Sequence, residues 1–193
     1  MIFFLHGEDE FLVSQRKQAL VLAFQKKYTG AEYFVFDFED QGTAQDVRRA
    51  LDTCVGGLFA TEKIVVFLHP FVLGESAEKL MVEFLKERGA ALPERTILMF
   101  VHSGKIKKTH PLTKVVLATM NKEEVCDALA EKTLERFLLK ELALFNEHVT
   151  IDPQALRVFL AITGSDTARQ ITELEKLATF KGEGTITVED IEL

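Results

Sequence analysis

The residues Ile64-Val65-Val66-Phe67-Leu68 form a short and unbroken apolar run. β-Branched and aromatic side chains dominate it, which favours a strand. A strand with one solvated face would alternate apolar and polar residues, and this run does not. It therefore predicts a strand buried on both faces, as in a parallel sheet that helices cover on both sides. More than any other stretch, it restricts the chain to an α/β fold.

Similar runs recur in the first two thirds of the chain, and segments with helical periodicity separate them. The expected strands are Ile2–His6, Glu32–Phe38, Ile64–Leu68, Thr96–Val101 and Glu124–Cys126. The expected helices are Phe11–Lys27, a segment that Thr43 caps and Gly56 ends, Glu75–Arg88 and a short one at Pro111–Thr119. This alternation predicts a parallel five-stranded sheet with flanking helices.

The pattern changes near Ala128, where apolar residues continue at helical spacing alone. Asp152-Pro153 is typical of a helix start, because Asp caps the helix and Pro fits its first turn. We therefore expect an α/β domain over residues 1–127 and a small all-helical domain over 128–193.

Composition restricts the partners. A protein that grips DNA by itself is usually basic, whereas this chain has a formal net charge of −7. It is expected to meet proteins, or to touch nucleic acid only within an assembly. Cys54 and Cys126 lack metal spacing and fit a reducing cytoplasm. The start of the chain has no basic segment typical of a signal peptide, and no apolar run is long enough for a membrane span. We expect a cytoplasmic protein without a membrane partner.

The loop after the first expected strand is unsuited to a nucleotide. A phosphate-binding loop needs a second glycine and a Lys-Ser/Thr pair. Here Gly7 is followed by Glu8, Asp9 and Glu10, whose charges repel a polyphosphate. The third strand ends in His69-Pro70 and lacks the acidic pair that would hold Mg²⁺. We expect no nucleotide-binding residue.

Three histidines offer an alternative function. His6, His69 and His102 each come at or just past the end of an expected parallel strand, the edge where α/β sheets place ligands. Three imidazoles there could bind Zn²⁺ in a metal-dependent hydrolase. The other interpretation is three unrelated, partly solvated residues. A receiver-like signalling domain is a further alternative, but His69-Pro70 occupies the place of the Asp it needs after the third strand.

Leu58-Phe59 is an unusual pair, since adjacent side chains cannot easily enter one core together. Either the pair fills the groove between helix and sheet, or it is held out for a partner to bind. Together with its surroundings it resembles the delta subunit of the bacterial DNA polymerase III clamp loader. The segments that carry the resemblance, in family order, are Leu5–Leu12, Leu58-Phe59, Ile97–Val101, Glu173–Leu177 and Thr185–Thr187.

The resemblance implies an AAA+-like α/β domain followed by a helical lid domain, with no ATP binding or hydrolysis. The arginine finger of other loader subunits, in a Ser-Arg-Cys context, is missing here, because Glu124-Val125 precede Cys126. The implied function is to bind the sliding clamp (beta) and help open it for loading on DNA during replication. Leu58 and Phe59 are the implied clamp-binding residues. Gly56 is a departure, since some members carry an apolar residue there.

The implied partners are the clamp, the gamma/tau and delta prime subunits in the full-length protein, and DNA within the complex. No intrinsic activity, catalytic residue, cofactor or resident metal is expected, so the protein would be classed with DNA-directed DNA polymerase only as a holoenzyme subunit. Lys105, Lys107 and Lys108 form a dense basic run. This run is either a solvated loop or a contact to DNA phosphate or a neighbouring subunit. The family's C-terminal collar domain is expected to be absent, and the isolated chain to be a monomer.

Overall fold

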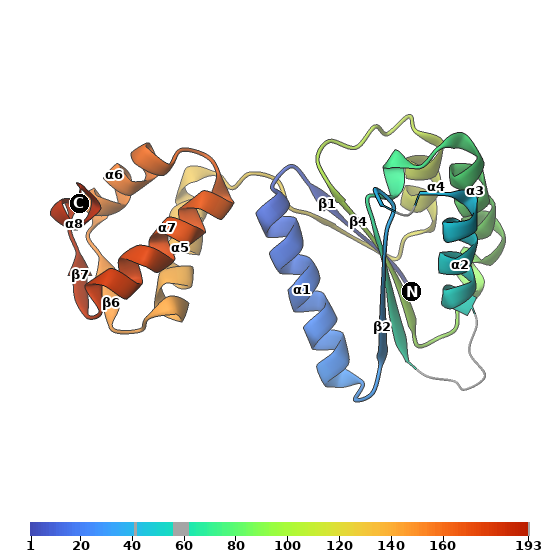
Figure 1. Ribbon diagram of the computed structural model, residues 1–193, viewed down its shortest axis with the longest axis horizontal. Helices are drawn as coiled ribbons and strands as arrows, with labels where there is room; N and C mark the ends of the chain where they lie inside the picture. The colour runs from blue at the N-terminus through green and yellow to red at the C-terminus, as the bar shows by residue number, and fades with distance from the viewer. Residues whose placement is uncertain (41, 56–61, 193) are drawn as a thin grey trace. The chain divides into compact units, whose positions relative to one another are not determined.

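The computed structural model describes residues 1–40, 42–55 and 62–192 (Figure 1). The chain divides into two compact units, Met1–Asp127 and Ala128–Leu193.

The first unit is built on a five-stranded sheet with strand order β2-β3-β4-β1-β5, and every pairing in it is parallel. Its strands are β1 (Ile2–Gly7), β2 (Glu32–Asp37), β3 (Lys63–Leu68), β4 (Thr96–Ser103) and β5 (Lys122–Val125). The predicted α/β class and parallel five-stranded sheet are confirmed.

The fifth strand starts two residues before its predicted position. Phe3 pairs with Lys122, and His6 pairs with Val125. Three of the four residues of β5 are charged, so the strand has no apolar signal. An edge strand tolerates them because the side chains reach solvent. Lys122 also places its ammonium 5.2 Å from the centre of the Phe3 ring.

Helices cover both faces of the sheet, as the continuous apolar strands require (Figure 1). On one face, α2 (Ala44–Val55), α3 (Glu75–Arg88) and α4 (Pro111–Thr119) pack on a cluster that includes Phe67 and Phe100. On the other face, α1 (Glu10–Lys27) packs on a second cluster that includes Val66 and Met99. Two short 3₁₀ turns, η1 (Pro70–Val72) and η2 (Gly89–Ala91), precede and follow α3.

Local capping explains where two of the helices begin. Asp9 caps α1, since its Oδ1 accepts the Leu12 N–H at 3.0 Å. The predicted cap at Thr43 is confirmed. Its Oγ1 accepts the Asp46 N–H at 3.2 Å, while Asp46 accepts the Thr43 N–H at 3.2 Å.

The second unit is mainly helical. Its elements are α5 (Glu131–Phe145), β6 (Val149–Ile151), α6 (Pro153–Thr163), α7 (Thr167–Lys181), β7 (Gly184–Ile186) and α8 (Val188–Glu192). The predicted start at Asp152-Pro153 is confirmed, because Asp152 Oδ1 accepts the Gln154 N–H at 2.7 Å. The all-helical expectation needs a correction, since β6 and β7 form a parallel pair. Three-residue strands are too short for a periodicity to reveal.

Within the described part of the chain, no helix combines the length and apolar character that crossing a membrane requires.

Candidate functional site

The parallel sheet has two chemically different edges. The carboxyl-terminal edge is where β1, β2, β3 and β4 end, and the amino-terminal edge is where the strands begin. In open α/β sheets, ligands usually bind at the carboxyl-terminal edge.

The loop between β1 and α1 lies at the carboxyl-terminal edge, and its backbone N–H groups donate to residues that follow β5. The Glu8 N–H donates to Asp127 Oδ1 at 3.1 Å, and the Asp9 N–H donates to the Cys126 carbonyl at 3.1 Å. A Cβ on Gly7 would lie 2.1 Å from the same carbonyl oxygen, so only glycine fits there. The N–H groups of Glu8 and Asp9 are thus already paired with protein oxygens.

The charges around this loop are negative. Glu8, Asp9 and Asp127 lie together, and Lys105 reaches Glu8 with a nitrogen–oxygen distance of 3.7 Å. Phosphate cradles need free backbone N–H groups and a cation, whereas here the N–H groups of Glu8 and Asp9 donate to a carboxylate and a carbonyl, and Lys105 lies near Glu8. That no nucleotide binds here stays a prediction.

The histidines at this edge pair with carboxylates from different strands. His6 Nε2 lies 2.9 Å from Glu123 Oε1 on β5. His69 Nδ1 lies 2.8 Å from Asp37 Oδ1 and 3.8 Å from Glu39 Oε2. The alternative of a site built from His6, His69 and His102 is not supported, since these three do not form a group of converging ligand atoms in the described residues. A metal ion could instead be held by groups of His, Cys, Asp or Glu whose ligand atoms lie within 4.8 Å of one another. In the described ranges, the one group of three or more such residues is Asp37, Glu39 and His69.

His102 lies beside these pairs and differs from them. Burial lowers the pKa of its imidazole, and the charges of His69 and His6 lower that pKa further. Its Nδ1 is buried and has no hydrogen-bond partner among the residues that the structure describes. His102 is therefore uncharged at neutral pH.

The basic loop joins β4 to α4 at the same edge. Lys105, Lys107 and Lys108 are all exposed, whereas Ile106 packs against the core. The Gly104 N–H donates to the Gly7 carbonyl at 2.7 Å and holds the loop against the end of β1. In the described residues, neither Lys107 nor Lys108 forms an ion pair. The loop thus presents three exposed lysines at the carboxyl-terminal edge.

Leu58 and Phe59, the predicted clamp-binding pair, lie outside the described residues. The residues that flank the segment are fixed at the amino-terminal edge. Lys63, the first residue of β3, is buried, and its Nζ donates to the Thr53 carbonyl in the last turn of α2 at 3.1 Å. Glu62 pairs with Arg95, which precedes β4. Sequence reasoning missed Lys63, because a charged residue before an apolar run is ordinarily exposed.

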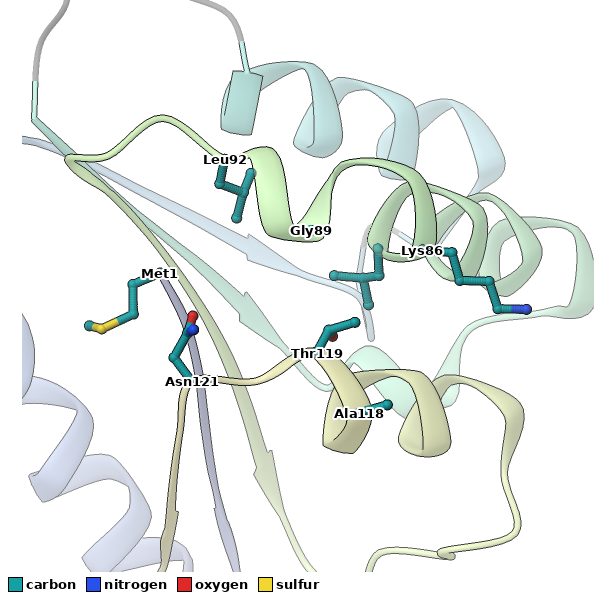
Figure 2. Close-up of a pocket in the computed structure, with 8 residues that line it drawn as sticks. Met1, Lys86, Gly89, Leu92, Ala118, Thr119 and Asn121 are labelled. Carbon is teal, nitrogen blue, oxygen red and sulfur yellow. The ribbon is translucent and has the colours of Figure 1, made fainter.

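A cleft of about 530 Å³ also lies at the amino-terminal edge (Figure 2). Met1 and Asn121, which precede β1 and β5, line it on one side, while Gly89 and Leu92 line it on another. Lys86 is the one lining side chain that carries a charge.

The cysteines have no reactive environment. Burial raises the pKa of the Cys54 thiol to about 12, and it also raises the pKa of Cys126. Both thiols are therefore protonated at neutral pH and are poor nucleophiles.

Sequence reasoning also missed Asp37 and Glu39 as partners of His69. Asp37 lies within the predicted strand Glu32–Phe38, and Glu39 directly follows it. Without the strand order, nothing indicated that β2 and β3 are neighbours.

Comparisons with known proteins agree on the fold. A delta protein of the Bacillus subtilis DNA clamp loader (YqeN) matches with a TM-score of 0.57 and 18% identity, over 99% of this chain and 57% of that one. The Thermotoga maritima RuvB Holliday junction branch migration motor matches with a TM-score of 0.65 and 11% identity, over 98% of this chain and 59% of that one. The chain thus spans less than two thirds of the length of these structures. At these identities the matches show a shared fold alone.

A complex of Escherichia coli HORMA, CdnC and Trip13 contains a further match, with a TM-score of 0.57 and 13% identity, over 84% of this chain and 59% of that one. A search among curated proteins finds no match. The family model for the delta subunit of DNA polymerase III matches residues 3–125, which is more than half of the chain. The chain therefore belongs to the family of DNA polymerase III delta subunits.

Proposed function

We propose that this protein acts in clamp loading as a delta subunit, and that it binds the ring-shaped sliding clamp without hydrolysing ATP. The family match over residues 3–125 carries the proposal, because it spans Leu58-Phe59 and both edges of the sheet. In this role the protein works in the cytoplasm with the gamma/tau and delta prime subunits.

Leu58 and Phe59 supply the contact to the clamp in this proposal. Burying one Leu and one Phe side chain in an apolar pocket is worth about 3–6 kcal/mol. The bond from Lys63 to Thr53 supports the assignment, since it fixes both flanks of the segment to the sheet. Fixed flanks reduce the entropy that is lost when the segment binds.

The clamp contact acts by shifting a conformational equilibrium and performs no chemistry. A bound protein shifts the equilibrium between closed and open rings only by its different affinities for the two states. ATP hydrolysis belongs to other subunits. The loop after β1 supports this division, because the N–H groups of Glu8 and Asp9 already donate to protein oxygens and the carboxylates of the loop repel a phosphate.

The basic loop is the proposed contact to DNA phosphate or to a neighbouring subunit. Three exposed lysines on a segment anchored by Ile106 support it. The whole chain is acidic, so this contact is proposed to form within the assembled loader and not in the isolated chain.

The proposal is tested by titrating the chain with the sliding clamp of the same organism, with and without Mg·ATP. Saturable binding is expected, with the same dissociation constant in both titrations. Calorimetric titration of the chain with Mg·ATP alone should give no heat of binding. Absence of clamp binding would contradict the clamp-loading role, and micromolar ATP binding would contradict the nucleotide-free assignment.

A further inference from the structure

Asp37, Glu39 and His69 form a chelating arrangement that the clamp-loading role does not use. Asp37 is the last residue of β2, and His69 directly follows β3, so the parallel pairing of these strands brings them together. One donor atom from each of the three residues lies within 4.8 Å of the others. Two oxygens and one imidazole nitrogen therefore converge at the carboxyl-terminal edge.

Backbone hydrogen bonds hold the main chain of His69 and the carboxylate of Asp37. His69 adopts a left-handed conformation with φ 51°, and its N–H donates to the Val101 carbonyl at 3.1 Å. Asp37 Oδ1 accepts the Glu39 N–H at 3.1 Å. Ligands held in place before an ion arrives lose less entropy when they bind it.

The donor set selects a class of ion. Imidazole suits first-row transition metals, whereas Mg²⁺ prefers six oxygens in near-octahedral geometry. Ligand atoms bound to one Zn²⁺ at about 2.0–2.2 Å lie about 3–4 Å apart. The distances of 2.8 and 3.8 Å from His69 Nδ1 to the two carboxylates are close to that spacing.

The surroundings also admit a cation. The carboxylates of Asp37 and Glu39 bring two negative charges. Besides His69, Lys17 on α1 is the positive group whose charge acts on Asp37. His102, from the neighbouring strand β4, is uncharged and carries a buried Nδ1 without a hydrogen-bond partner in the described ranges. The charges of His69 and Glu39 both act on this imidazole.

We propose that Asp37, Glu39 and His69 bind one divalent first-row transition metal ion, for which Zn²⁺ is the probe. The ion replaces the bond between His69 and Asp37, so Nδ1 binds the metal as a lone-pair donor while the imidazole proton resides on Nε2. It joins the ends of β2 and β3. The proposal departs from the sequence-based expectation of no resident metal, and it does not depend on clamp binding.

The test is calorimetric titration of the 193-residue chain with ZnCl₂ in a non-chelating buffer. One Zn²⁺ per chain is expected to bind, and Mg²⁺ is expected to give no comparable binding. His69→Asn should weaken Zn²⁺ binding by at least about tenfold. Asn is chosen because it tolerates the left-handed backbone at this position. Lys17→Gln should tighten binding, since it removes the neighbouring positive charge.

His148→Gln is the matched control, because His148 lies 3.9 Å from Glu147 in an exposed pair elsewhere in the chain. This variant should bind Zn²⁺ as the parent does. A second readout is the melting temperature, which Zn²⁺ should raise in the parent and not in His69→Asn. Failure of the parent to bind Zn²⁺, or equal Zn²⁺ affinity in the parent and His69→Asn, would overturn the proposal.

Discussion

The two edges of the sheet differ in which groups the protein's own hydrogen bonds occupy. At the carboxyl-terminal edge, where relatives of this fold place ligands, the N–H groups of Glu8 and Asp9 are paired with Asp127 and Cys126. At the amino-terminal edge, internal bonds such as Lys63 to Thr53 fix the flanks of the segment with Leu58 and Phe59. Two backbone N–H groups at the edge that ordinarily binds a nucleotide are thus already paired with protein oxygens. Changes at the two edges should therefore affect different properties.

The largest expected effect is on clamp affinity at the amino-terminal edge. Leu58→Ala/Phe59→Ala should weaken clamp binding at least about a hundredfold, because about 3–6 kcal/mol of apolar burial is lost. The free energy of unfolding should change by less than about 1 kcal/mol, as for surface positions. Titration with the clamp and denaturant unfolding measure the two quantities. If the pair fills the core, the variant would instead lose several kcal/mol of stability.

The second largest effect is on stability at the carboxyl-terminal edge. Gly7→Ala places a Cβ 2.1 Å from the Cys126 carbonyl oxygen, and the two backbones must separate. We expect a loss of about 3 kcal/mol in the free energy of unfolding. Clamp affinity per folded molecule should stay the same. A stable Gly7→Ala variant with weakened clamp binding would reverse the roles assigned to the two edges.

A smaller effect is expected from Lys63→Met, which keeps the buried length of the side chain and removes its charged donor. Loss of the bond to the Thr53 carbonyl should cost about 1.5–3 kcal/mol. It also frees one flank of the Leu58-Phe59 segment, so clamp binding should weaken by less than in the double variant. Unfolding and clamp titrations on the same preparation separate the two effects. Unchanged stability would show that the bond is not what fixes the flank.

The smallest effect is on the pH dependence of stability, through an ion pair that joins α1 to β5. Arg16 bonds Glu124, with Nη2 2.9 Å from Oε1, and this bond is the main reason that the pKa of Glu124 falls from 4.5 to about 2. Since the folded-state pKa is the lower one, the stabilisation is present above about pH 4.5 and is lost as the pH falls toward 2. Solvent exposure keeps it below about 1 kcal/mol. Glu124→Gln should remove this contribution to the pH dependence of the free energy of unfolding. Denaturant unfolding of the parent and the variant from pH 6 to 2.5 can check this. An unchanged profile would contradict it.

Local patterns were enough to predict the buried strands, because their apolar side chains record the covered faces. They were not enough for β5, where charged residues form an edge strand, or for β6 and β7, which are three residues long. The bond from Glu8 to Asp127 joins residues 119 positions apart, so no local pattern indicates it. The partners of His69 depend on the strand order for the same reason. Leu58 and Phe59 lie outside the described residues, and their role stays a prediction.

The central claim is that the amino-terminal edge meets the clamp. Amide hydrogen exchange of the chain, with and without saturating clamp, tests it directly. We predict slower exchange on clamp binding in the peptides that span Cys54–Ile64, and unchanged exchange in those that span Gly7–Leu12 and Gly104–His110. Protection confined to the last two regions, with none in Cys54–Ile64, would contradict the account.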